Sequence, residues 1–205
     1  MLVKPQGERR EMLTEENAIV LDYMARGKPS SYKTEAVAQV IGIEHFTLLE
    51  IVPKAELKTM EEVYIGREER EKVERIKQRI SYEELTNNSV AEIEKAIEGI
   101  VSKNEKRFVD FFNTAGAITI RRHTLELLPG MGKKHLFSIL EERAKKPFES
   151  FADIEKRVHL MPNVLHTIVK RIIEELMGEA EKHYLFARPP VRKEESFQRR
   201  ERESF

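Results

Sequence analysis

Glycines and lysines spaced as in a phosphate-binding turn lie at residues 129–134, where the chain reads Pro-Gly-Met-Gly-Lys-Lys. Glycine adopts positive φ angles and has no side chain, so another backbone can approach it closely. A helix that begins at the lysines directs its first, unpaired amides outward at the positive end of its dipole. Amides in this position bind phosphate. We therefore predict an anion site formed by Gly130, Met131, Gly132, Lys133 and Lys134.

The charges around this turn favour a polyanion, although the chain as a whole is neutral, with 36 basic and 36 acidic residues. Seven bases lie between residues 118 and 146: Arg121, Arg122, Lys133, Lys134, Arg143, Lys145 and Lys146. Three acids accompany them: Glu126, Glu141 and Glu142. Because the excess is local, we add Arg121 and Arg122 to the predicted contact surface. The alternative is a purely structural turn between two packed helices.

No group of residues predicts catalysis. The six histidines are scattered, and no Gly-x-x-x-x-Gly-Lys-Ser/Thr loop is present. Neighbouring acids on a helix diverge around its axis, so acidic pairs are expected to be solvated. Cysteine is absent, which excludes disulfides and thiolate metal sites. The sequence has no apolar run of about 20 residues and no signal-like N-terminus, so we expect a cytoplasmic protein. Because no group of residues predicts catalysis, we also expect that it is not an enzyme.

The elements that position the turn separate into two kinds. Residues 18–24, 36–42, 46–53 and 63–66 are rich in β-branched and aromatic residues and predict the strands of a small barrel. Its candidate base-stacking aromatics are Tyr23, Tyr32, Phe46 and Tyr64. Helices are expected over residues 67–79, 82–101 and 108–115, as is an apolar helical run ending at Leu128.

After the turn, a helix is predicted to end near residue 146, before a proline. Ser150 is a candidate N-cap for the next helix. A degenerate second hairpin follows at residues 158–164, with Asn163 as the residue suited to positive φ, and then a helix over residues 165–177. The organisation is a barrel at 1–66, a helical connector at 67–103, helical hairpins at 104–178, and a return strand at 184–187 with a disordered charged tail in 179–205.

The hairpin, with Pro147-Phe148 and the Ser150 cap after it, resembles tandem helix-hairpin-helix domains of DNA-binding and repair proteins. Together with the segments at 36–39, 46–50, 63–66 and 111–113, it resembles the archaeal domain-of-unknown-function family 655 over nearly the whole chain. The resemblance implies an α+β protein: a small N-terminal OB-like β-barrel followed by an all-α tandem helix-hairpin-helix domain. It further implies that the carbonyls of Glu126, Leu128 and Met131 hold a monovalent cation; no other cofactor is expected.

From these observations we expect a nucleic-acid-binding protein, with RNA favoured and DNA possible, that grips the phosphate backbone largely independently of sequence. The alternative is a protein-interaction adaptor, or an accessory subunit of an RNA-processing or repair complex. No membrane partner is expected.

Overall fold

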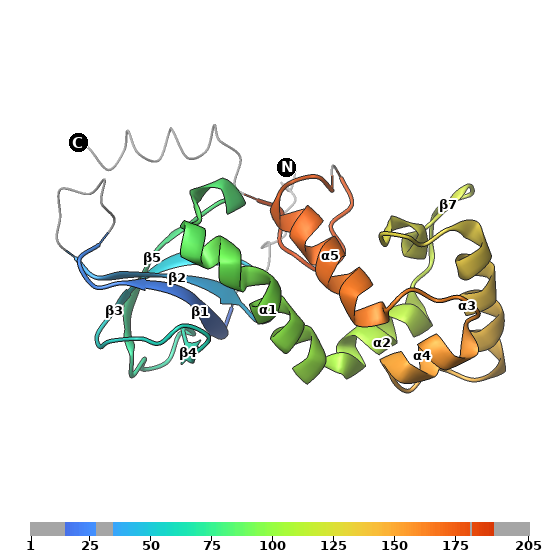
Figure 1. Ribbon diagram of the computed structural model, residues 1–205, viewed down its shortest axis with the longest axis horizontal. Coiled ribbons are helices and arrows are strands. Elements are labelled where there is room, and N and C mark those ends of the chain that lie inside the picture. The colour runs from blue at the N-terminus through green and yellow to red at the C-terminus, as the bar shows by residue number, and fades with distance from the viewer. Residues whose placement is uncertain (1–14, 28–34, 181, 191–205) are drawn as a thin grey trace, which may run out of the picture.

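The computed structural model describes residues 15–27, 35–180 and 182–190 (Figure 1). Five antiparallel strands form a sheet in the order β4-β1-β2-β3-β5. A short two-stranded hairpin and the helices follow the sheet along the chain. The strands are β1 (Asn17–Met24), β2 (Val37–Gly42), β3 (Leu48–Pro53), β4 (Glu62–Tyr64) and β5 (Val73–Arg79).

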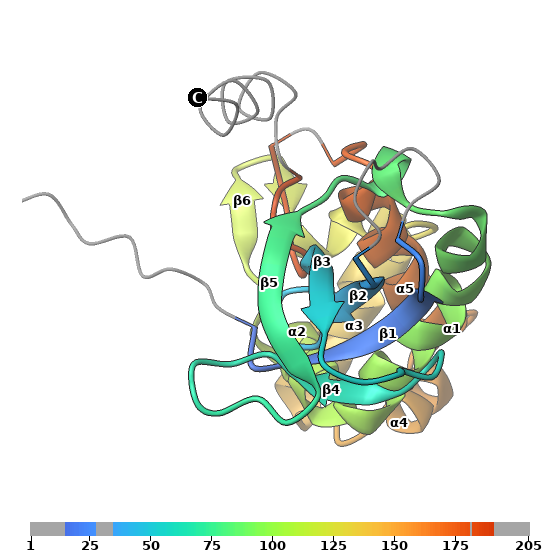
Figure 2. The ribbon, with the colours of Figure 1, turned by 90° about the vertical axis from the view of Figure 1, so that its left-hand side faces the viewer.

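The sheet curls into a half-barrel, with the short β4 and the long β5 as its two edges (Figure 2). Side chains alternate between its faces along each strand. Those on one face, such as Val20, Val40 and Ile51, form a cluster within the curl. Those on the other face, such as Leu21 and Ile41, share a single core with the helices. The sheet and the helical part are therefore packed together on a common hydrophobic core.

The charged helix predicted over residues 67–79 is wrong, because Val73–Arg79 form β5. Glu, Lys and Arg favour helices, but here Val73 is fully buried in the curl and the segment pairs along β3. Long-range pairing has therefore overridden local propensity. The sheet extends past the predicted boundary at residue 66, and residues 67–103 are not a continuous helical connector.

The helical part contains α1 (Asn87–Lys103), α2 (Glu105–Thr114), α3 (Lys133–Lys145), α4 (Phe151–Arg157) and α5 (Val164–Leu176). The 3₁₀ helices η1 (Tyr82–Glu84) and η2 (Thr124–Leu127) and the hairpin strands β6 (Ala117–Thr119) and β7 (Arg122–His123) complete it. In Figure 1, α1 lies against the sheet, whereas α3 and α4 lie at the far end of the molecule. The turn before α3 is thus remote from the sheet.

The return strand predicted at residues 184–187 does not form. Instead, the buried carboxylate of Glu175 accepts the amides of Leu185, Phe186 and Ala187 at 2.7, 2.9 and 2.8 Å. These donors are therefore unavailable to a neighbouring strand. The chain nevertheless returns to the sheet, where the amide of Arg188 donates to the carbonyl of His45 at 2.9 Å. Residues 191–205, the predicted tail, lie outside the described residues.

Candidate functional site

The turn at residues 128–132 has the backbone geometry expected of its glycines. Gly130 has φ of +76°, and the amide of Met131 donates to the carbonyl of Leu128 at 3.1 Å. Gly132 is the N-cap of α3, which begins at Lys133 as predicted. Met131 is buried beneath the turn, whereas Gly130 and Gly132 are exposed. The turn is therefore anchored by one side chain while its backbone faces outward.

The first amides of α3 are unpaired. The first hydrogen bond of the helix runs from the amide of Leu136 to the carbonyl of Gly132 at 3.0 Å. Gly132 has no side chain to cap the amides of Lys133, Lys134 and His135. A Cβ atom placed on Gly132 would meet nothing within 4 Å, so the approach to these amides is open. Unpaired amides at the positive end of a helix dipole are groups that can bind an anion.

Four of the predicted bases are free to contact a ligand. Arg121, Arg122, Lys133 and Lys134 are exposed, and none of them forms an ion pair with another residue of the described chain. Other bases of this region are engaged: Lys145 pairs with Glu141 and Glu142, and Lys146 with Glu149. Arg143 donates to the carbonyls of Phe112 and Ala115, each at 2.9 Å. The free positive charge is therefore concentrated at the start of α3 and on the β6–β7 hairpin.

The apolar helical run predicted before the turn is wrong. Residues 117–123 form the β6–β7 hairpin, and the 3₁₀ helix η2 leads into the turn. The hydroxyl of Thr119 accepts the amides of Arg121 and Arg122, and Thr124 donates twice to the carbonyl of Gly116. Such local side-chain bonds compete with helix formation. Arg121 and Arg122 consequently lie at the hairpin tip, and no hydrogen bond joins them to the turn.

His123 supports η2 and does not extend toward a ligand. Its Nδ1 accepts the amide of Leu125 at 3.1 Å, and its own amide donates to Glu126 at 2.7 Å. Burial lowers the pKa of His123, and the nearby Arg143 lowers it further. The ring is therefore neutral at pH 7 and adds no charge to the site.

Among the predicted cation ligands, the Leu128 carbonyl already accepts the Met131 amide. Cation binding by the carbonyls of Glu126, Leu128 and Met131 remains a prediction.

The second turn, before α5, is closed to anions. Asn163 accepts the amide of His166 at 2.8 Å, and the carboxylate of Glu155 accepts that of Val164 at 2.8 Å. The positive φ predicted for Asn163 is wrong: its φ is −54°, and Leu160 adopts +56° instead. At the start of α5, side-chain oxygens of Asn163 and Glu155 therefore accept helix amides. The corresponding amides at the start of α3 have no such partners among the described residues and could bind a ligand instead.

The two turns lie against each other. A Cβ atom on Gly130 would lie 3.8 Å from Cγ of Pro162, and Nε2 of His135 lies 3.1 Å from the carbonyl oxygen of Leu160. The second turn therefore flanks the open start of α3 without itself offering free amides.

Leu160 holds a strained conformation on the surface, with φ of +56° and 78% of its area exposed. An L-residue with a branched side chain is disfavoured there by about 1–2 kcal/mol, whereas Asn tolerates this region. We expect Leu160→Asn to raise the free energy of unfolding by about 0.5–1 kcal/mol. Urea denaturation measures this change. An equal or lower stability would show that Leu160 makes packing contacts that outweigh its strain.

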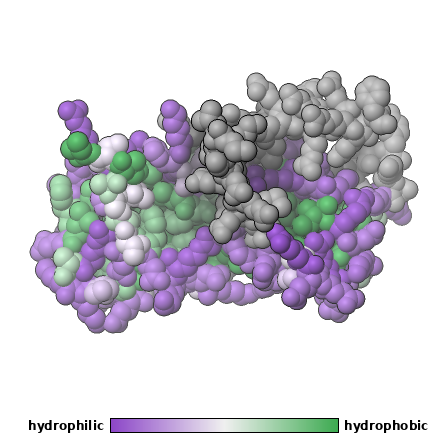
Figure 3. Space-filling model, turned by 180° about the vertical axis from the view of Figure 1, so that it is seen from behind, coloured by the Kyte–Doolittle hydropathy of each residue, from purple (hydrophilic) through white to green (hydrophobic). Residues whose placement is uncertain are grey.

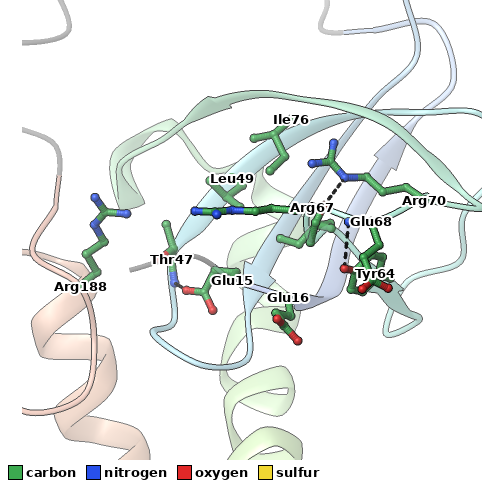
Figure 4. A pocket seen from close by; sticks show the side chains of 12 residues that line it. Glu15, Glu16, Thr47, Leu49, Tyr64, Arg67, Glu68, Arg70, Ile76 and Arg188 are labelled. Atoms are coloured by element: carbon green, nitrogen blue, oxygen red, sulfur yellow. Dashed lines mark hydrogen bonds between the residues drawn. The ribbon is translucent and has the colours of Figure 1, made fainter. Parts of the chain in front are cut away.

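A groove at the open edge of the half-barrel was not predicted from the sequence. It has a volume of about 630 Å³ and lies between the β4 side and β5 (Figure 4). Arg67 extends across it, while Arg70 donates to the carbonyl of Gly66 at 2.7 Å. Its lining residues are Glu15, Glu16, Thr47, Leu49, Tyr64, Ile65, Gly66, Arg67, Glu68, Arg70, Ile76 and Arg188. The groove joins residues from both ends of the described chain, a proximity that no local motif signals.

Of the barrel aromatics predicted to stack on bases, Tyr64 lines this groove, and its hydroxyl accepts the amide of Glu68 at 3.2 Å. Phe46 is fully buried, so its predicted stacking role is wrong. Tyr23 packs against the cluster within the curl, and Tyr32 lies outside the described residues.

Glu15, at the base of the groove, organises the turn between β2 and β3. Its carboxylate accepts the amides of Glu44, His45 and Thr47. Burial by itself would raise the pKa of Glu15, but these hydrogen bonds outweigh it and lower the pKa. Burial and the hydrogen bond with Glu15 raise the pKa of Glu44. Glu15 is therefore an ionised carboxylate whose role is to hold the β2–β3 turn.

The molecule is thus an α+β protein in which a half-barrel sheet is followed by helices that carry an open glycine turn. It belongs to the family described as a protein of unknown function, DUF655, whose model matches residues 14–188. This match confirms the resemblance to family 655 that was inferred from the sequence.

Two archaeal proteins are similar to the chain over most of its length. The uncharacterised protein MJ0038 of Methanocaldococcus jannaschii is 41% identical over 177 residues, which are 85% of this chain and 80% of that protein. The crystal structure of Af1531 from Archaeoglobus fulgidus, also assigned to DUF655, matches with a TM-score of 0.79 at 44% identity. That match covers 85% of this chain and all of Af1531. Within the described ranges, no helix has the length and apolar character needed to cross a bilayer.

Proposed function

We propose that the protein binds nucleic acid, with RNA favoured, by gripping the sugar-phosphate backbone at the start of α3. The observation that carries the proposal is the contrast between two helix starts in one chain. At α3 the amides are open and Lys133 and Lys134 are unpaired, whereas at α5 Asn163 and Glu155 cap the amides. Phosphate contacts of this kind are independent of sequence. The role is binding rather than catalysis.

In this proposal, η2, the turn and α3 act as a helix-hairpin-helix whose first arm has shortened to a 3₁₀ helix. The half-barrel supports the same class of ligand. A five-stranded, partly open antiparallel barrel is the OB architecture, which binds oligonucleotides. The edges β4 and β5, where such a barrel would close, border the groove that carries Tyr64, Arg67 and Arg70. The groove would give the bound strand a second contact surface.

The test is a fluorescence-anisotropy titration of single- and double-stranded RNA and DNA at several salt concentrations. Each neutralised phosphate contributes about 0.9 to the slope of log affinity against log salt for duplex DNA, and about 0.7 for single strands. We expect the double substitution of Lys133→Ala with Lys134→Ala to reduce the slope by roughly 1.4–1.8 if each lysine neutralises one phosphate. Both side chains are exposed, so the fold is retained.

Lys145→Ala with Lys146→Ala is the matched control, because it removes the same charge from the other end of α3, where acids already pair with both lysines. We expect the control to change the slope by less than about 0.5, since these lysines contact no phosphate in the proposal. Equal effects of the two double substitutions would indicate diffuse attraction and contradict a site at the turn. Binding partners that survive nuclease treatment of a lysate would support the adaptor alternative instead.

A further inference from the structure

Exposed apolar side chains accompany the basic residues at the start of α3 and on the β6–β7 hairpin, which form no ion pair within the described chain. Phe137 is 66% exposed, Leu160 78%, and Ile120 is fully exposed at the tip of the β6–β7 hairpin. Ile120 directly precedes Arg121 and Arg122 in the chain. Figure 3 shows apolar surface at this end of the molecule, between hydrophilic areas. Single exposed apolar residues are common, so their significance depends on how they lie relative to the anion site.

Phe137 lies on the same face of α3 as the two free lysines. It follows Lys133 by four residues and Lys134 by three, and side chains at these spacings are neighbours on a helix. Aromatic side chains in helices also point back toward the N-terminus. The ring therefore lies toward the open amides, within about one turn, or about 5 Å along the axis.

Leu160 lies beside α3 on its His135 side, about 160° around the helix from Phe137. Its carbonyl lies 3.1 Å from Nε2 of His135, which is the third residue of α3. The turn presents a leucine to solvent in a backbone conformation that costs stability, and strain of this kind concentrates at functional sites. We use the name hairpin face for Lys133, Lys134 and Phe137.

We infer that the hairpin face binds unpaired nucleotides: the α3 amides and lysines hold a phosphate, and Phe137 stacks on the base that this phosphate carries. The inference rests on the proposed function and deepens it by naming a single-stranded target. In a duplex, bases are paired and stacked, so a ring beside the backbone phosphate cannot reach their faces. An unpaired base offers its π-face, and stacking on aromatic side chains is the common mode for single strands.

Charge complementarity favours a nucleic acid over an apolar protein surface as the ligand of the hairpin face. A polyanion satisfies the free lysines and the amides together, whereas an apolar protein surface would bury Lys133 and Lys134 without partners.

The test compares Phe137→Ala with the parent protein on a single-stranded RNA 15-mer and on the same sequence as a blunt duplex, at one salt concentration. Stacking is worth about 1–3 kcal/mol per base, so we expect single-strand affinity to fall by about 5- to 150-fold and duplex affinity by less than about 2-fold. Met177→Ala is the control. Met177 is an apolar residue that is 50% exposed, and it follows the C-terminal end of α5, whereas the second turn precedes the N-terminal end of that helix.

The outcomes separate this inference from the proposed function. If the Lys133, Lys134 double variant loses affinity for both nucleic acids while Phe137→Ala changes neither, backbone binding stands and base stacking is overturned. Equal losses on the single strand and the duplex for Phe137→Ala would also overturn it. If Phe137→Ala leaves RNA binding intact but releases a nuclease-resistant protein partner, the hairpin face is a protein interface and the inference fails.

Discussion

Gly132→Asp is expected to lower oligonucleotide affinity by about 100-fold or more without destabilising the protein. At the N-cap of α3, the new carboxylate would be placed to accept the amides of Lys134 and His135. Asn163 and Ser150 each accept the third amide of α5 and α4 from the same position. A bound phosphate would then lose two charge-assisted hydrogen bonds of about 1.5–3 kcal/mol each and meet a like charge. Anisotropy titrations measure the loss.

The fold should tolerate this substitution because Gly132 has an ordinary φ of −88° and a Cβ there would meet nothing within 4 Å. A cap and a favourable dipole interaction should raise the free energy of unfolding by about 0.5–1 kcal/mol. Gly132→Ala is the matched control: it adds a side chain but no acceptor and no charge, so we expect binding within a few-fold of the parent. Affinity for Gly132→Asp equal to that of Gly132→Ala would show that the α3 amides do not bind the ligand.

Glu175→Ala is expected to cause the largest loss of stability, about 3–5 kcal/mol. The Glu175 carboxylate is fully buried and pairs with Nε of Arg171 at 2.9 Å, while it also accepts the amides of Leu185, Phe186 and Ala187. Its removal would leave Nε of the buried Arg171 guanidinium and three buried or half-buried amides unpaired. Urea denaturation gives the change in the free energy of unfolding.

Glu174→Ala is the control for Glu175→Ala, because Glu174 lies 3.8 Å from the same Arg171 but is partly exposed. We expect a loss below about 1 kcal/mol, because the 3.8 Å separation and the partly exposed Glu174 carboxylate make this pair weak. Similar losses for the two substitutions would mean that the charge of Arg171, and not the capture of residues 185–187, determines the stability of this region.

The features that the sequence predicted correctly have local causes. The start of α3 at Lys133, the positive φ of Gly130 and the cap at Ser150 each depend on a few neighbouring residues. The open glycine turn was therefore visible in the sequence, since Pro-Gly-x-Gly specifies its own backbone. The local excess of positive charge beside the turn was predicted by counting the basic and acidic residues around it.

The features that sequence reasoning missed depend on distant contacts. β5 is a strand because it pairs with β3, which no local propensity of its charged residues indicates. Leu160 adopts positive φ in place of Asn163 because Asn163 is used as the α5 cap. The groove joins Glu15 to Arg188 across the whole chain. Local signals thus identified the turn and its lysines, whereas the surfaces around them required the folded structure.

Backbone amide shifts during titration with a single-stranded oligonucleotide, followed by ¹H–¹⁵N NMR, test most directly whether the start of α3 binds phosphate. We predict that the amide signals of Lys133, Lys134 and His135 show the largest chemical-shift changes, and that these changes saturate along the binding curve. The capped amides of Val164 and His166 serve as an internal reference and should stay in place. Saturable binding that leaves the three α3 amides unmoved while the groove residues shift would contradict the proposed site.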